Sequence, residues 1–208
     1  MNFELEVDFT TDQVKALLAA GQHVTIVKSV AGGGSTTVAW LAFSPFNSND
    51  VTWTESYYIY STTSSLTAGT TLRQASETDD PAILGHLYEL SGNVFADQGS
   101  QSIYAGQYAA TNQNGQNNLA FGLSQDALVN GADVLAPICA IPVRNTNTAT
   151  FVPSQNLSVY MSDTIDNGVV VSSVSSTASK ICLTTQHNKA TLTYDSNNNQ
   201  FTVVYSSV

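Results

Sequence analysis

The chain has 208 residues, of which 42% are hydrophobic and only 11% are charged, and its formal net charge is −10. Charged residues usually make up about 25% of a globular protein, so uncharged polar side chains must cover much of this surface. Nucleic-acid binding depends on Lys and Arg contacts to phosphates, and with only six such residues we expect no nucleic-acid partner.

The N-terminal segment has the pattern of an amphipathic strand. Apolar residues from Phe3 to Phe9 alternate with polar ones, and a period of two is typical of a strand with one buried face. The segment lacks the basic and apolar regions of a secretory signal, and no run approaches the ~20 apolar residues of a membrane-spanning helix. We therefore expect a protein that is cytoplasmic or is released without a standard signal peptide.

A short helix is predicted next, over residues 11–20. Thr10 and Gln13 have the spacing of a capping box at its start. Leu17 belongs to an apolar stripe, and Gly21 stands where a helix C-terminus favours glycine. No other segment of the sequence combines these helix signals.

Two strands joined by a glycine-rich turn follow the helix. Residues 23–30 are rich in β-branched side chains, and Gly32–Ser35 has the composition of a flexible turn. Residues 36–44 are apolar on both faces, which indicates a central strand. We therefore predict a hairpin formed by these two strands.

The densest aromatic run of the sequence, residues 51–60, is predicted to be one strand. Side chains of a strand alternate between two faces. One face is mostly apolar and is expected in the core, while the other is rich in hydroxyl groups and ends in Tyr58 and Tyr60. We predict that these two phenols contact a ligand. If the register is inverted, the ligand face instead consists of Trp53, Glu55 and Tyr57.

The rest of the chain contains many short strand candidates separated by polar turns. Asn130–Gly131 is a typical hairpin dipeptide, and the most polar region, 97–118, is expected to form exposed loops around one strand. Short strands at such spacing predict an all-β protein. We expect a single-domain antiparallel β-sandwich, residues 1–208, with one short N-terminal helix. The remaining strand candidates are 83–90, 93–95, 119–123, 134–143, 149–151, 157–161, 169–174, 180–184, 190–194 and 201–205.

Motifs for catalysis are missing from the sequence. It contains no nucleophile elbow, no phosphate-binding loop and no dinucleotide fingerprint. The three histidines do not have the spacing of metal ligands. We therefore expect a protein that is not an enzyme, with no catalytic residue, no metal site and no cofactor. Cys139 and Cys182 lie in apolar runs, and we predict that both are buried free thiols.

The aromatic and hydroxyl-rich surface suits two kinds of ligand. The apolar face of a sugar ring packs on an aromatic ring, while hydroxyl and amide side chains bind its hydroxyl groups. Phenols also attract a quaternary ammonium group through cation–π contact. The expected partner is therefore a glycan or a choline-type lipid headgroup at a membrane surface, and a second copy of the chain is a further candidate.

The order of elements over residues 10–60 resembles that of the actinoporins and the related fungal fruit-body lectins. A helix (11–20) precedes a strand (23–30), a glycine turn and a strand that carries Trp40. The resemblance implies a β-sandwich and an aromatic patch that binds phosphocholine. The chain departs from this pattern because a strand precedes the helix and no basic, Trp-rich surface loop is present. No functional residue is transferred from the resemblance.

Three functions are consistent with these observations. The first is a lectin-like, glycan-binding defence protein. The second is a membrane-binding, pore-forming cytolysin of the insecticidal toxin type. The third is a self-assembling structural or storage protein, because few charged residues protect the edges of its sheets from pairing with other chains.

Overall fold

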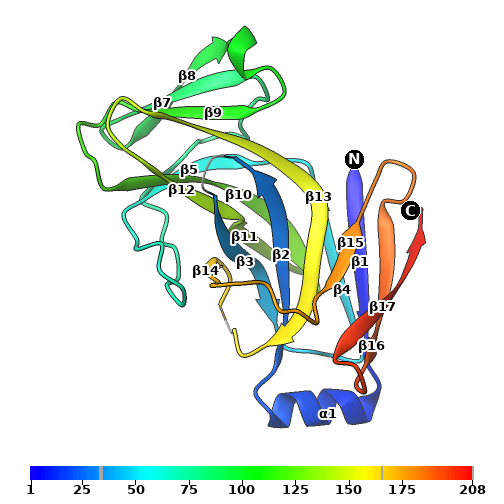
Figure 1. Cartoon of the computed structure of the whole chain (residues 1–208). Helices are drawn as coiled ribbons and strands as arrows, with labels where there is room; N and C mark the ends of the chain where they lie inside the picture. The colour runs from blue at the N-terminus through cyan, green and yellow to red at the C-terminus, as the bar shows by residue number, and fades with distance from the viewer. Residues whose placement is uncertain (33–34, 165, 208) are drawn as a thin grey trace.

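Strands dominate the structure, a computed structural model that describes residues 1–32, 35–164 and 166–207. The predicted turn at 32–35 includes residues 33 and 34, which lie outside the described residues. The helical elements are α1 (Thr11–Ala19) and a 3-10 turn, η1 (Ser102–Tyr104) (Figure 1). The strands are β1 (Asn2–Asp8), β2 (His23–Ala31), β3 (Thr36–Phe43), β4 (Ser48–Thr54), β5 (Tyr58–Thr62), β6 (Ser76–Glu77), β7 (His86–Ser91), β8 (Val94–Ser100), β9 (Tyr108–Asn112), β10 (Leu119–Val129), β11 (Ala132–Pro137), β12 (Cys139–Val143), β13 (Thr148–Ser162), β14 (Val169–Val170), β15 (Ser179–Cys182), β16 (Lys189–Asp195) and β17 (Gln200–Ser206).

The strands form two main layers. One layer runs β17–β16–β1–β4–β10, and β5, β11 and β12 also pair with β10. The other runs β3–β2–β13–β15, and a small group of β7, β8 and β9 extends from the first half of β13 at the top of Figure 1. Both layers contribute to one apolar core, in which the Trp40 ring of β3 meets the Trp53 ring of β4 edge-on at 5.5 Å.

The predicted fold class is confirmed: the protein is an all-β sandwich with one short N-terminal helix. The pairing is mainly antiparallel, as expected, but β1 pairs with β16 and β7 pairs with β9 in parallel. The predicted hairpin of β2 and β3 is present. Asn130 and Gly131 both have positive φ, 51° and 82°, and they join β10 to β11 as the dipeptide predicted.

Helix α1 closes one end of the sandwich, at the bottom of Figure 1. The predicted capping box is confirmed, because Gln13 N donates to Thr10 Oγ1 at 3.3 Å and Thr10 N donates to Gln13 Oε1 at 2.9 Å. Leu17 is buried, and Gln13 Nε2 donates to the carbonyl of Tyr194 at 3.1 Å. No helix in the described part of the chain is long and apolar enough to cross a membrane.

The aromatic segment is two strands rather than one. β4 ends at Thr54 and β5 begins at Tyr58, and the two strands pair with different parts of β10. Trp53 and Tyr57 are buried in the core, as the alternation predicted. Glu55, which the same alternation placed on the core face, lies in the break between the strands and is exposed.

The prediction that Tyr60 lies on an exposed face was wrong. Its side chain is fully buried, and its hydroxyl donates to the carbonyl of Cys139 at 2.8 Å. A second apolar cluster, which includes Val38 and Leu72, covers this face of β5. Gly122 on β10 leaves room for the ring, because a Cβ there would collide with it. Tyr58 is half-buried.

β13 joins two segments that the sequence predicted as separate strands, 149–151 and 157–161. Its pairing with β2 is irregular between Pro153 and Leu157. Such a bulge re-aims the side chains within it. Gln155 lies in this irregular stretch and is buried, which places an amide inside the sandwich.

The cysteines differ from the prediction in one respect. Both are free thiols and Cys139 is buried, but Cys182 is exposed. Ile181 points into the core from β15, so the alternation of the strand directs its neighbour Cys182 outward. Burial raises the pKa of the Cys139 thiol to about 12.

We therefore expect one thiol that reacts rapidly with a thiol reagent and one that is protected from it. A maleimide should add once to the native protein, at Cys182, and a second time only after denaturation, because Cys139 is buried and protonated. Mass spectrometry of the adducts gives the count. The control variant Cys182→Ser should remain unlabelled in the native state, and rapid labelling of that variant would contradict the burial of Cys139.

Candidate functional site

Three of the five predicted ligand residues surround one buried lysine. Trp53, Glu55 and Tyr57 meet near Lys28 of β2. Tyr60 of β5 instead belongs to the second apolar cluster, and Tyr58 is half-buried. Lys28 is only 3% exposed. The structure therefore brings together the residues of the alternative register and separates them from the two phenols that were predicted first.

Lys28 fills an aromatic cage of its own chain. Its Nζ lies 5.3 Å from the centroid of the Trp40 ring, 5.7 Å from that of Trp53 and 5.1 Å from that of Tyr57. An ammonium group within about 6 Å of an aromatic face is attracted by the ring. An internal cation thus occupies the cation-binding faces that a choline group would need on Trp53 and Tyr57.

Two buried amides complete the surroundings of the ammonium group. Nζ of Lys28 donates to Gln125 Oε1 at 2.7 Å and to Gln155 Oε1 at 2.9 Å. An ammonium group can only donate, so both amide oxygens must point toward it. The Gln155 oxygen also accepts from Trp53 Nε1 at 3.0 Å.

The amide nitrogen of Gln155 connects this cluster to Glu55. Nε2 donates to Glu55 Oε1 at 3.0 Å and to the Tyr57 hydroxyl at 3.2 Å. Lys28, Gln155 and Glu55 therefore form a chain from the core to an exposed carboxylate. We call Lys28, Gln125, Gln155 and Glu55 the polar cluster.

Burial controls the protonation of these groups. It lowers the pKa of Lys28 to about 7, while the nearby Glu55 charge acts in the opposite direction. Burial also raises the pKa of the Tyr57 phenol, which therefore stays neutral, and the Glu55 charge adds to this effect. Lys28 is the member of this cluster whose charge changes near neutral pH.

A cavity of about 320 Å³ opens beside Glu55 and Tyr57. This volume is at the lower end of the range for small-ligand pockets, about 300–1,000 Å³. Tyr108 of β9 forms part of its wall, with its ring edge-on to that of Tyr57 at 5.5 Å. The rest of the wall comes from Leu84, Gly106, Val152 and Pro153. We call this cavity the Glu55 pocket.

The Glu55 pocket contains polar groups that are free to bind a ligand. Among the described residues, Gln155 alone hydrogen-bonds to Glu55, and it does so through Oε1. No described residue hydrogen-bonds to the Tyr108 hydroxyl. Burial and then the Glu55 charge raise the pKa of Tyr108, so its phenol can donate at neutral pH. The pocket thus offers a carboxylate acceptor, a phenol donor and an apolar wall.

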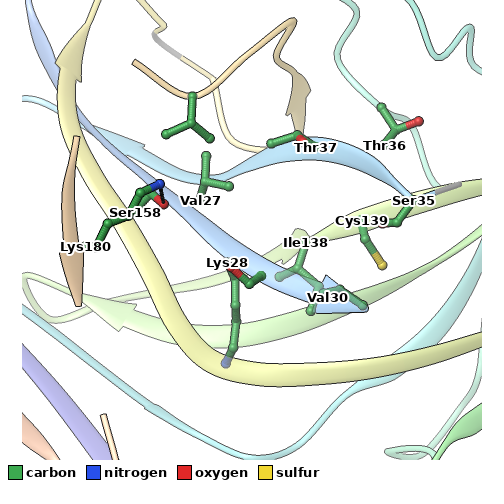
Figure 2. A pocket seen from close by; sticks show the side chains of 12 residues that line it. Val27, Lys28, Val30, Ser35, Thr36, Thr37, Ile138, Cys139, Ser158 and Lys180 are labelled. Atoms are coloured by element: carbon green, nitrogen blue, oxygen red, sulfur yellow. Dashed lines mark hydrogen bonds between the residues drawn. The ribbon is translucent and has the colours of Figure 1, made fainter. Parts of the chain in front are cut away.

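A second cavity, of about 240 Å³, lies between β2, β3, β12 and β15. Figure 2 shows Lys180 donating to Ser158 Oγ at one side, a bond of 2.7 Å, while the Lys28 side chain leads away from the other lining residues. The thiol of Cys139 is part of its wall, but burial keeps that thiol protonated. The residues that line this cavity thus include two lysines and several hydroxyl side chains, and none of them is Asp or Glu.

Sequence analysis missed Lys28, Gln125, Gln155 and Tyr108 as site residues. A signal for the first three was present, because each interrupts the inward-facing apolar positions of its strand. Lys28 follows Val24 and Ile26 at the same parity, and Gln125 follows Leu123. Tyr108 was placed in a polar loop region, since nothing around it indicates that it meets Tyr57.

Comparisons with known proteins give no relative. The chain matches no protein-family model, no curated protein and no solved structure. Among the described residues, no group of three His, Cys, Asp or Glu side chains is placed to hold a metal ion.

Proposed function

We propose that the protein is a non-enzymatic, lectin-like protein that binds a glycan in the Glu55 pocket. The observation that carries the proposal is the position of Glu55, an exposed carboxylate held by Gln155 at the edge of a cavity lined by two phenols. A carboxylate accepts hydrogen bonds from sugar hydroxyl groups, and bonds to charged groups are the stronger ones. Leu84 and Val152 offer an apolar surface for the face of a sugar ring.

The experiment is a glycan array followed by titration of the best glycan against three variants. Glu55→Gln keeps the shape of the side chain and removes its charge, so it should weaken binding about tenfold, as the loss of a hydrogen bond to a charged group does. Tyr108→Phe should weaken binding less, because it removes one neutral hydroxyl group. Tyr58→Ala is the matched control, since Tyr58 lies outside the pocket lining, and it should bind like the wild type.

Two results would overturn the glycan proposal. One is an array without a bound glycan. The other is a glycan whose Kd is the same for the wild type and Glu55→Gln, because that ligand would bind elsewhere.

A choline-type lipid headgroup is the second candidate, and exposed aliphatic side chains favour it. Ile83, Leu84 and Ile103 are 51%, 52% and 77% exposed. The loops that carry them are joined by hydrogen bonds, for example from Gly85 N to the Gln107 carbonyl at 2.8 Å. Exposed apolar groups near a pocket are typical of surfaces that meet a membrane or another protein.

Vesicles separate this candidate from the first. If the protein is a membrane-binding cytolysin, it should sediment with phosphatidylcholine vesicles and release their contents, and Ile103→Ser should reduce both effects. The glycan proposal expects no sedimentation with vesicles that lack glycolipid. Self-association, the third function considered, would appear as a dimer or larger species in sedimentation velocity. The exposed strand β17 is where we would look for it, because among the described strands it pairs with β16 alone.

A further inference from the structure

The described groups that hydrogen-bond to Lys28 Nζ are acceptors. Its Nζ faces two amide oxygens and three aromatic faces. The amide nitrogens point elsewhere, with Gln125 Nε2 bonded to the Thr54 carbonyl at 2.6 Å and Gln155 Nε2 bonded to Glu55 and Tyr57. A neutral amine has a lone pair that needs a donor. The cage therefore fits the protonated lysine better than the neutral one.

The ionisable groups that face Lys28 from the packed elements are few. Glu55, in the link between β4 and β5, is the charged group that acts on it, and the Tyr57 phenol is the other titratable group. β3 and β4 contribute neutral indoles, while β10 and β13 contribute neutral amides. Burial lowers the pKa of Lys28 to about 7, so the lysine changes its charge close to physiological pH.

Loss of that proton weakens the hold of Lys28 on Gln155. The protonated lysine requires the Gln155 oxygen, and this leaves the Gln155 nitrogen to face Glu55. Neutral Lys28 keeps two N–H donors, but its hydrogen bonds to the amide oxygens lose their charge assistance, and charge-assisted bonds are about twice as strong as neutral ones. Its lone pair also faces amide oxygens and ring faces, which offer it no donor.

We propose that Lys28 is a proton-controlled positioning residue for the Glu55 pocket: when protonated it holds Gln155 and, through it, Glu55 firmly in the binding arrangement, and when neutral it holds them less firmly. The effect on ligand affinity rests on the proposed glycan function, but the coupling between Lys28 and Glu55 does not. Binding should therefore weaken as the pH rises from 6 to 8.

The chain itself carries the probe for this coupling. Its two tryptophans, Trp40 and Trp53, are the two indoles that surround Lys28. Intrinsic fluorescence and the indole N–H signals in an NMR spectrum should show one transition with a midpoint near pH 7 in the wild type. Lys28→Met should abolish it. Glu55→Gln should lower the midpoint by about one pH unit, because it removes a charge that favours the ammonium form.

The control variant is Asp12→Asn, whose side chain is 98% exposed on α1 and which should leave the midpoint unchanged. If Lys28→Met fails to fold, the lysine ¹³Cε signals of the wild type give the same information, since one of its four lysines should titrate near neutral pH. The inference is overturned if no lysine titrates between pH 5.5 and 8.5. It is also overturned if the Glu55→Gln variant has the same transition midpoint as the wild type. A titrating Lys28 with an empty glycan array would instead overturn the proposed function and leave the coupling intact.

Discussion

Replacing Trp53 with alanine is expected to lower the free energy of unfolding by about 3–5 kcal/mol, the range for large aromatic side chains deleted from a core. The ring is 4% exposed, stacks on Phe3 at 5.8 Å and meets Trp40 edge-on. Its loss also opens one wall of the Lys28 cage and removes a donor from Gln155. Urea unfolding of the variant at one pH gives the value.

The matched comparison for Trp53 lies on β5. Tyr60→Ala should destabilise the protein by a similar amount, because the ring is fully buried and its hydroxyl donates to the Cys139 carbonyl. Tyr58→Ala should have the smallest effect of the three, since Tyr58 is only half-buried. If Trp53→Ala left the free energy of unfolding unchanged while Tyr58→Ala lowered it strongly, the inward and outward faces of this segment would be exchanged.

The architecture was predictable because local patterns determine it. Alternation identified β1, and the capping box at Thr10 located the start of α1. The period of two also assigned Trp53 and Tyr57 to the core. These signals are local, so they do not depend on how distant segments pack.

The burial of Tyr60 could not be predicted from its own strand. Alternation separates two faces, but it does not say whether the second face is exposed or covered. Here Leu72 and Val170 cover it, and they come from other segments, the loop after β5 and the distant strand β14. The same limit applies to Tyr108, which meets Tyr57 only because β9 pairs with the first half of β13.

The polar cluster also leaves a signal in the sequence, because its residues interrupt the alternation of apolar and polar side chains along their strands. Lys28, Gln125 and Gln155 each occupy an inward position of their strand. Glu55 has the parity of Trp53 and Tyr57, although it follows the end of β4 and is exposed. One polar residue at such a position is commonplace, and sequence analysis singled out Glu55 alone. Polar residues at inward positions of three strands indicate a shared buried network, because isolated buried polar groups are unfavourable. Which of them meet still depends on the pairing of the strands.

Retaining a lysine in this cluster opposes stability. Burying a charge carries a desolvation penalty, which Lys28→Met removes, although the variant also takes away the donor that Lys28 provides to the Gln125 and Gln155 oxygens. Lys28→Met keeps much of the length of the side chain and leaves out the charge. We expect this variant to fold, and a greater stability than that of the wild type at pH 6 would agree with a functional role for the charge.

Lys28 also makes the stability of the protein depend on pH, in a direction that can be worked out. In the unfolded chain its pKa is the ordinary value of 10.5, whereas burial lowers it to about 7 in the folded protein. Between these values the unfolded state binds more protons than the folded state, so the free energy of unfolding rises with pH. The penalty for burying the charge is fully present below pH 7 and disappears progressively above it.

We therefore expect the wild type to become more stable by about 2 kcal/mol between pH 7 and pH 9, since one pKa unit corresponds to about 1.4 kcal/mol. Above pH 9 the buried Cys139 thiol, whose pKa is raised to about 12, acts in the opposite direction, and this sets the upper limit of the window. Urea unfolding at pH 7, 8 and 9 measures the change. Lys28→Met retains every other titratable group, so the difference between the two proteins isolates the lysine. If the difference in free energy of unfolding between the two proteins stays constant from pH 7 to pH 9, Lys28 keeps its proton in the folded state. The cage of acceptors would then stabilise the ammonium form by more than burial destabilises it.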